Sequence, residues 1–303
     1  MLWTGRFDGD DPLYHRIFQR VSLEENYDAI SPNDFVLHGF AVDEGVRRNK
    51  GNVGSKDAPD VIRKNMTNFP VFNAEFSLKD FGNIECKNEN LEESQNLLAE
   101  KVKIVLEKGG RSIVLGGGHE VMFGHYSGIR KAFPNKKIGI INIDAHFDNR
   151  EVDSEIGASS GTGFWQIAQN EKINSLHIGI QKNSNTLKLF DTAHQFGMKY
   201  ILSDEIFFEN LPSIYEKLDL FSDDVDLLYI TICMDVFNAS ISPGVSAPSY
   251  NGIFADAAFM HLYKKLLQSE KLVALDIAET NPFLDQNERT ARLGASLINE
   301  WFI

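Results

Sequence analysis

Six short apolar runs constrain the fold of this chain more than any other feature. They occupy residues 35–42, 111–117, 136–144, 175–180, 226–235 and 271–279. Each run is continuously apolar, without the polar alternation of a half-exposed strand, and this is typical of strands that are covered on both faces. Helical patterns lie between the runs, and alternating strands and helices indicate βαβ units. We therefore predict an α/β fold of three layers, α/β/α, around a mostly parallel central sheet.

The helical segments have recognisable ends. Asn90 is placed to cap a helix that runs to Gly109-Gly110, since asparagine favours the first position of a helix and glycine its end. Further helices are predicted over about 121–133, 204–218, 256–268 and 290–302. The chain has no internal repeat and no linker rich in Pro, Gly or Ser. We predict a single domain over residues 1–303, with residues 1–34 as an N-terminal extension that packs on it.

Composition excludes several classes of function. The net charge of −13 opposes unspecific binding to nucleic acid or to an anionic membrane. Two cysteines, Cys86 and Cys233, supply no disulfide framework and no zinc-binding Cys pair. The N-terminus lacks the apolar segment of a signal peptide, and no apolar run is long enough to cross a bilayer. We expect a cytoplasmic protein whose partner is a small molecule.

The segment Asp144-Ala-His-Phe-Asp148 carries the strongest chemical signal. Asp144, His146 and Asp148 alternate directly after an apolar run, so on an extended backbone their side chains point the same way. Two carboxylates and an imidazole on one face are costly to bury without a cation. A metal site is the preferred interpretation, and a hydrogen-bonded polar strand end is the alternative.

His119 follows Gly116-Gly117-Gly118 at the end of another predicted strand. Glycines allow a sharp turn that brings the imidazole close to neighbouring strand ends. The alternatives are a structural histidine or a phosphate-binding glycine turn. The segment lacks the lysine and Ser/Thr of a P-loop and the spacing of a dinucleotide fingerprint, which disfavours the phosphate interpretation.

Two further strand ends supply Cys233, Asp235 and Glu279. Together with the residues above, Cys233 and Asp235 give more than four donor groups, which indicates two metal ions that share ligands. A ligand set rich in carboxylates favours Mn²⁺ over Zn²⁺. Cys233 itself has three interpretations: buried filler, nucleophile or metal ligand. Glu279 is a candidate for holding a cationic substrate group, and a helix-capping or supporting role is its alternative.

In combination, these motifs resemble the ureohydrolase superfamily, which includes the arginases and agmatinases. The resemblance rests on GGGHE (116–120), DAHFD (144–148), the strand bearing Asp235 before a Pro-Gly loop, and DIAETNP (276–282), in the family's order. The segments 3–9, 43–55, 159–164 and 242–248 are similar to the formimidoylglutamase subgroup. Segment 159–164 lacks the histidine of arginases and agmatinases. Family members are commonly oligomeric, so we expect a homo-oligomer.

The resemblance implies hydrolysis of N-formimidoyl-L-glutamate to L-glutamate and formamide, a step of histidine degradation. A hydroxide that bridges two metal ions would attack the amidine carbon. The implied metal ligands are His119, Asp144, His146, Asp148, Cys233 and Asp235. Asp148 would relay a proton and Glu279 would pair with the amidinium. The implied substrate contacts are Arg150, Ser160, Thr162 and Asn185.

Arg150 and the basic run at 47–51 each have two possible interpretations. Arg150 would hold a substrate carboxylate, but a simple surface arginine is its alternative. The run Arg-Arg-Asn-Lys-Gly at 47–51 is either a solvated face or a patch that attracts a substrate with two carboxylates.

The chain departs from the family pattern near Cys233. The family has D-x-D-x-x-D, whereas this chain has Cys233, Asp235 and Asn238. A thiolate is softer than a carboxylate, so it would shift the metal preference toward Zn²⁺ or Fe²⁺ or weaken one of the two expected Mn²⁺ sites. Two other hypotheses therefore stand: a hydrolase of another guanidino or amidino compound, and a non-enzymatic member with a degraded metal site.

Overall fold

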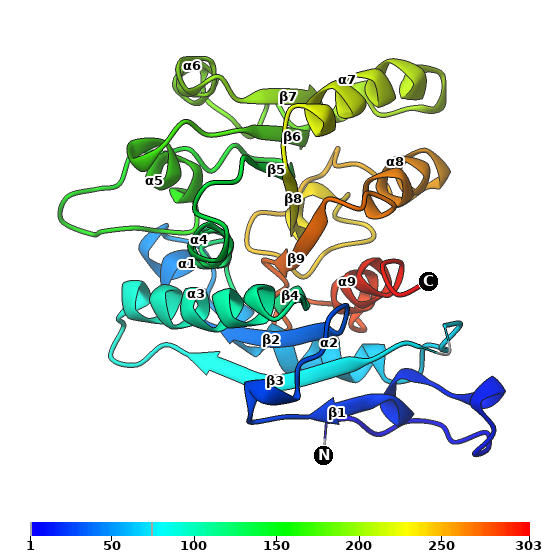
Figure 1. Ribbon diagram of the computed structural model, residues 1–303. Helices are drawn as coiled ribbons and strands as arrows, with labels where there is room; N and C mark the ends of the chain where they lie inside the picture. Colours follow the sequence, from blue (N-terminus) through cyan, green and yellow to red (C-terminus); the bar gives the residue numbers. More distant parts are fainter. Residues whose placement is uncertain (1, 74) are drawn as a thin grey trace.

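A single sheet of parallel strands organises the molecule (Figure 1). The computed structural model describes residues 2–73 and 75–303. Within them the strands are β1 (Val21–Leu23), β2 (Phe35–Ala41), β3 (Leu78–Glu85), β4 (Arg111–Leu115), β5 (Ile138–Ile143), β6 (Ser175–Ile180), β7 (Lys199–Leu202), β8 (Leu227–Cys233) and β9 (Leu272–Ala278). Their order across the sheet is β1-β3-β2-β4-β9-β8-β5-β6-β7.

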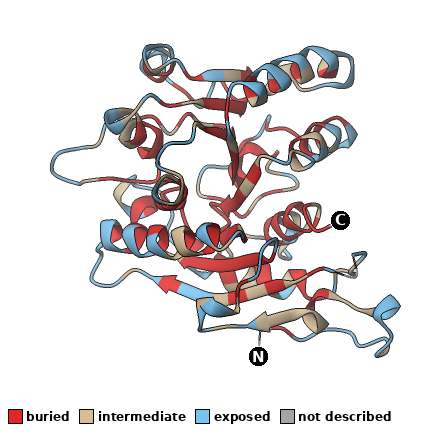
Figure 2. Cartoon of the chain, in the orientation of Figure 1, coloured by how far each residue is buried: buried red, intermediate tan, exposed pale blue. Residues whose placement is uncertain are grey.

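Helices cover both faces of this sheet. They are α1 (Glu44–Arg48), α2 (Ala58–Met66), α3 (Leu91–Glu107), α4 (Val121–Ala132), α5 (Gly163–Asn170), α6 (Leu187–Phe196), α7 (Leu211–Asp223), α8 (Ala257–Leu267) and α9 (Arg289–Asn299). Figure 1 shows α3 to α6 on one side and α2, α7, α8 and α9 on the other. Each layer packs on the sheet through its own buried apolar cluster. In Figure 2 the burial runs through the central strands and the inner faces of the helices. The predicted α/β/α fold is confirmed.

The strands that were not predicted from apolar runs lie toward the margins of the sheet. β3 is partly exposed and carries polar residues, while β1 and β7 are short strands at the two edges. An edge strand is only partly covered, so it has no continuous apolar run to detect. Four helices, α1, α2, α5 and α6, were also not predicted.

The predicted helix over 204–218 was wrong at its start. The structure forms 3-10 turns at Ser203–Glu205 and Phe208–Asn210, and α7 begins only at Leu211. Pro212 lies in the first turn of α7, where proline is favoured because its missing N–H would have no partner in the helix. In contrast, Asn90 caps α3 as predicted, since its side chain accepts a hydrogen bond from the Glu93 N–H at 3.1 Å.

The N-terminal segment is integrated into the fold. Trp3 and Ile17 join the buried cluster on the α2 and α9 side, and the Trp3 indole donates to Asp80 at 2.8 Å. β1 extends the sheet by pairing with β3. No helix in the described part of the chain is long and apolar enough to cross a membrane.

The topology brings four strand ends together. β4, β9, β8 and β5 are consecutive in the sheet and run parallel, so their carboxyl ends share one edge. The register pairs Ile143 with Ile232 and Cys233 with Ala278, which aligns the last residues of these strands. In open α/β sheets this edge is where ligands bind.

Candidate metal centre and active site

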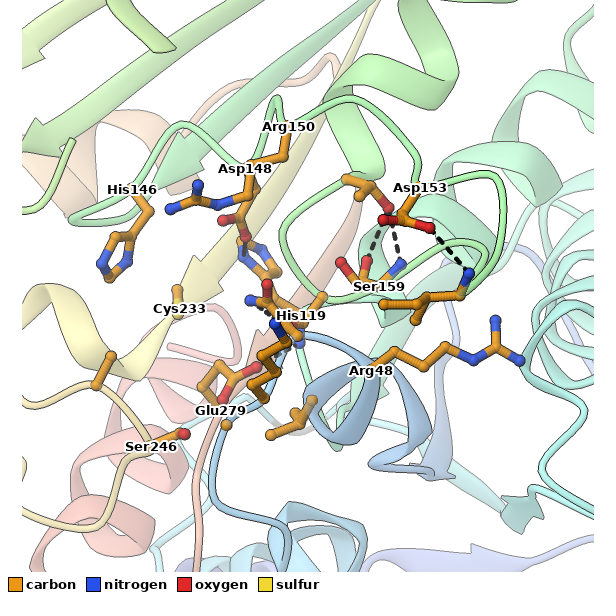
Figure 3. Close-up of a pocket in the computed structure, with 18 of the residues that line it drawn as sticks. Arg48, His119, His146, Asp148, Arg150, Asp153, Ser159, Cys233, Ser246 and Glu279 are labelled. Carbon is orange, nitrogen blue, oxygen red and sulfur yellow. Dashed lines mark hydrogen bonds and ion pairs between the residues drawn. The ribbon is translucent and has the colours of Figure 1, made fainter. Parts of the chain in front are cut away.

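Six predicted ligands gather at these strand ends, at the bottom of a cavity of about 600 Å³ that all of them except the fully buried Asp144 line, and we call this set the floor. The floor comprises His119, Asp144, His146, Asp148, Cys233 and Asp235. Figure 3 shows His119, His146, Asp148 and Cys233 together, with Arg48 and Asp153 toward the other end of the cavity. The floor therefore unites segments that lie more than one hundred residues apart in the sequence.

The floor contains two overlapping groups of donor atoms. In one group, ligand atoms of His119, Asp144 and Cys233 lie within 4.8 Å of one another, and in the other group those of Asp144, His146 and Asp235 do. Asp144 belongs to both groups. Asp148 adjoins the first, since its Oδ2 lies 2.8 Å from His119 Nδ1. Two groups that share a carboxylate have the arrangement that two neighbouring cations require.

A buried hydrogen-bond chain orients His119. Its Nε2 lies 2.9 Å from the Thr231 hydroxyl, which donates to Asp276 at 2.5 Å. Tyr229 also donates to Asp276, and His125 Nδ1 lies 2.7 Å from the same carboxylate. Because the Thr231 proton points to Asp276, Thr231 accepts from His119 Nε2–H, so Nδ1 is the nitrogen that faces the carboxylates and would offer its lone pair to a metal ion that displaced its proton. Such support behind a histidine fixes its tautomer for metal binding.

Thr231 and Asp276 stood outside the predicted site residues. Asp276 stands in the DIAE segment, and Thr231 lies two residues before Cys233 on the same strand face. Only the pairing of β8 with β9, which sets Thr231 opposite Asp276, makes their partnership visible.

Two site residues adopt a backbone conformation that side chains normally avoid. Asp148 has φ of +46° and Glu279 has φ of +66°. A non-glycine residue in this region costs about 1–3 kcal/mol and is found where the surrounding structure enforces it. The Asp148 carbonyl accepts from Phe164 N–H at 3.1 Å, and the Glu279 N–H donates to Gly117 O at 2.8 Å. The strain aims both carboxylates at the cavity that they line.

Glu279 is tied to the floor through the backbone. Its Oε1 accepts a hydrogen bond from the His119 N–H at 2.9 Å, and only 7% of the residue is exposed. Burial, together with the charges of Glu120 and Asp235, raises the pKa of Glu279 to about 8. A cation brought next to this carboxylate would favour its ionised form.

The electrostatics of the floor favour positive charge. Although burial opposes it, Asp144 and Asp148 raise the pKa of His119 well above its usual value. Burial also lowers the pKa of His146, but the charges of Asp235 and Asp144 outweigh burial and raise this pKa well above its usual value. Burial raises the pKa of Asp235, whose Oδ1 is buried and has no hydrogen-bond partner among the described residues. An orphaned carboxylate oxygen beside imidazole, thiol and carboxylate donors fits a divalent metal ion.

The outer part of the cavity, which we call the rim, carries the predicted substrate contacts. It comprises Lys50, Arg150, Ser160 and Thr162, all of which line the cavity. Arg150 is exposed and forms no side-chain hydrogen bond or salt bridge within the described residues. Ser160 accepts from Asn49 Nδ2 at 3.1 Å, and the Thr162 hydroxyl donates to Ser159 O at 2.9 Å. The two cations of the rim are therefore available to a ligand.

Asn185 lies elsewhere. It is absent from the cavity lining, and its Nδ2 donates to Ala145 O and Gln181 O, both at 2.8 Å. Its Oδ1 accepts from Phe147 N–H at 3.1 Å. Asn185 thus braces the loop that carries His146 instead of facing the cavity.

The basic run at 47–51 divides into two parts. Arg47 and Arg48 both pair with Glu44, at 2.6 and 2.8 Å, and Arg48 also pairs with Glu92 at 2.6 Å. These two arginines stabilise α1 and its surroundings. Lys50 has no such partner in the described chain and lines the cavity.

Comparison with known proteins decides the family. Residues 33–303 match the arginase family. The chain belongs to the arginase family. It is 38% identical to the formimidoylglutamase of Staphylococcus carnosus over 304 residues, which cover 99% of this chain and 97% of the relative. The formimidoylglutamase of Staphylococcus haemolyticus is 37% identical over 100% of this chain and 97% of its own. The arginase-family chain is thus a hydrolase that acts on carbon–nitrogen bonds of amidines.

Solved structures share the fold. The formimidoylglutamase of Bacillus subtilis superposes with a TM-score of 0.87 at 22% identity, covering 98% of this chain and 94% of that one. A Trypanosoma cruzi formiminoglutamase with Mn²⁺ gives a TM-score of 0.80 at 24% identity, over 89% and 92% of the two chains. The resemblance predicted from the sequence motifs is confirmed.

Proposed function

We propose that this arginase-family hydrolase converts N-formimidoyl-L-glutamate and water to L-glutamate and formamide, a step of histidine degradation. The observation that carries the proposal is the full-length similarity, at 37–38% identity, to relatives named formimidoylglutamase. The free cation Arg150 in the cavity supports it, because this substrate brings carboxylates.

The proposed cofactor is Mn²⁺, with two ions per chain. His119, Asp144, Asp148 and Cys233 would hold one ion, and Asp144, His146 and Asp235 the other. Ions bound there would supply the nucleophile at neutral pH, since they lower the pKa of water. The Mn²⁺ in the T. cruzi structure and the three carboxylates among the donors support the choice of metal.

The chain's own residues would position the substrate. Glu279 would pair with the amidinium, because a buried carboxylate with few donors gains most from a cation. Arg150 would hold a carboxylate by its two-pronged guanidinium, and Ser160 and Thr162 would offer hydroxyl contacts. Asn185 would act indirectly, through the loop of His146.

Asp148 would handle the proton. Its carboxylate lines the cavity and lies 2.8 Å from His119 Nδ1. When the oxygen of water attacks the amidine carbon, Asp148 would accept the proton and deliver it to the glutamate nitrogen. The carbon–nitrogen bond to glutamate then breaks, and formamide leaves with the amidine carbon and the new oxygen.

The test is formamide release by metal-free protein resupplied with Mn²⁺. We expect turnover of N-formimidoyl-L-glutamate and little turnover of agmatine or arginine. Preferred hydrolysis of a guanidino compound would replace the substrate assignment. Full metal uptake without turnover of any of the three would contradict the proposed activity.

A further inference from the structure

The two donor groups of the floor differ in chemistry at one atom. The group of His119 and Asp144 contains the sulfur of Cys233, whereas the group of Asp144, His146 and Asp235 contains only nitrogen and oxygen donors. Asp148, beside His119, adds an oxygen donor to the first group. The two positions are therefore not chemically equivalent.

The position of Cys233 differs from that of a cysteine that merely fills a core. The residue is only 2% exposed, yet it lines the cavity. The carboxylates of Asp144, Asp148, Asp235 and Glu279 lie near enough to act on it electrostatically. A thiol that fills space would normally lie among apolar groups. Here its surroundings are those of a cation site.

Strand geometry directs the thiol toward His119. Thr231 and Cys233 are two residues apart on β8, so their side chains emerge on the same face. Thr231 contacts Nε2 of His119 at 2.9 Å, on the side away from Asp148. The same face of one strand therefore supports the imidazole and adds a sulfur donor next to it.

We propose that Cys233 makes the floor a mixed metal centre, in which the His119 position selects a thiophilic divalent ion such as Zn²⁺, Co²⁺ or Fe²⁺ and the His146 position retains the hard ligands suited to Mn²⁺. The inference rests on the proposed function in taking the floor as a metal centre, and it replaces Mn²⁺ at the His119 position by a thiophilic ion. Soft thiolates favour Zn²⁺ and Fe²⁺, and carboxylates suit Mn²⁺. On binding, the S–H bond breaks, a sulfur–metal bond forms and the proton passes to solvent.

Charge balance is consistent with a thiolate at this position. Three carboxylates, of Asp144, Asp148 and Asp235, and one thiolate, of Cys233, carry as much negative charge as two divalent ions carry positive charge.

The first experiment adds Co²⁺ to the metal-free protein and records the near-ultraviolet absorption of a thiolate bound to Co²⁺. We expect the band in the wild-type protein and in Cys86→Ser, which alters the other cysteine of the chain. The band should disappear in Cys233→Ser and Cys233→Asp. Bound Co²⁺ without the band, or a band that survives in Cys233→Ser, would overturn the proposal.

A second experiment needs no variant and so does not depend on the folding of one. The wild-type protein is loaded from a mixture of Zn²⁺ and Mn²⁺, its metals are counted, and the X-ray absorption of the zinc is measured. We expect zinc and manganese together, with one sulfur neighbour about 2.3 Å from zinc. Zinc with only nitrogen and oxygen neighbours contradicts the mixed centre.

The outcomes separate this inference from the proposed function. Formamide release with no sulfur–metal bond would leave the activity standing and remove the mixed centre. A sulfur–metal bond without formamide release would do the reverse. Cys233→Asp should also shift the metals retained from the mixture toward manganese, as the ligand-softness argument requires.

Discussion

The floor and the rim of the cavity are built by opposite means. The floor side chains are mostly buried, start at the ends of packed strands and are held by hydrogen bonds such as His119–Thr231. The rim cations Lys50 and Arg150 are exposed, lie on loops and have no salt-bridge partners within the described residues. The floor, which is expected to perform the chemistry, is therefore preorganised, while the rim, which is expected to select the substrate, keeps its positive charges unpaired and available to a ligand.

The largest effect should follow from removing the carboxylate that both donor groups share. We expect Asp144→Asn to lower turnover by more than about 1,000-fold, since residues that act as a unit fail together. Metal analysis should show loss of both ions. Asp28→Asn, an equivalent change at an exposed position outside the cavity, should retain both. Two tightly held ions in Asp144→Asn would show that the floor does not depend on a shared ligand.

The next largest effect should follow from breaking the hydrogen-bond chain that runs from His119 through Thr231 to Asp276. Thr231→Val removes the hydroxyl that accepts from His119 Nε2, and we expect metal affinity to fall about 10–100-fold. Calorimetric titration with Mn²⁺ would measure it. Thr231→Ser keeps the hydroxyl and should restore most of the affinity, whereas equal losses in both variants would indicate a packing defect instead.

At the rim, the effect should appear in substrate binding. Arg150→Ala should raise KM about 10–100-fold with a smaller change in kcat, because a charge-assisted contact contributes about 1.5–3 kcal/mol. Arg150→Lys should recover only part of the lost substrate affinity, because an ammonium group cannot bind a carboxylate with the two parallel hydrogen bonds that a guanidinium makes. Steady-state kinetics with an amidine that has no carboxylate provides the control, and Arg150→Ala should leave that reaction unchanged.

The arginines paired with Glu44, unlike the rim cations Lys50 and Arg150, should contribute to the free energy of unfolding. Hydrogen bonds from Arg47 lower the pKa of Glu44. Burial acts in the opposite direction, and hydrogen bonds from Arg48 add to the lowering. Because the pKa is lowered in the folded state, the ion pairs stabilise the fold fully at pH values above the usual carboxyl pKa. This stabilisation is lost as the pH falls through the lowered pKa. Glu44→Gln should therefore cost about 1–3 kcal/mol near neutral pH and little once the pH falls below the lowered pKa of Glu44. Denaturant unfolding of metal-free protein measures the difference, and a pH-independent cost would contradict it.

The smallest effect is expected at Lys50. Lys50→Gln should raise KM about 2–5-fold at low salt and less at high salt, because an exposed cation attracts the substrate through a screened field. Lys56→Gln, an exposed lysine that does not line the cavity, serves as the matched control. An equal change in both variants would show a general charge effect.

The sequence predicted the central strands and the donor residues because both leave local patterns. Continuous apolar runs marked β2, β4, β5, β6, β8 and β9, and the alternation in 144–148 indicated a shared direction of three side chains. β1, β3 and β7 left no such pattern because they are partly exposed or short. Asn185 seemed equivalent to the rim residues in sequence, yet its amide is used up by backbone partners.

The sequence by itself determined the fold class, the chemical types of the donors and the departure at Cys233. Only the tertiary structure decided how those donors are grouped, because grouping depends on which strands are neighbours and in what register. The order β4-β9-β8-β5 brings Cys233 into the His119 group and sets Thr231 opposite Asp276. The cysteine that the sequence left as either a soft ligand or a cause of weak metal binding is thereby located in one of the two donor groups, where its sulfur can be tested directly.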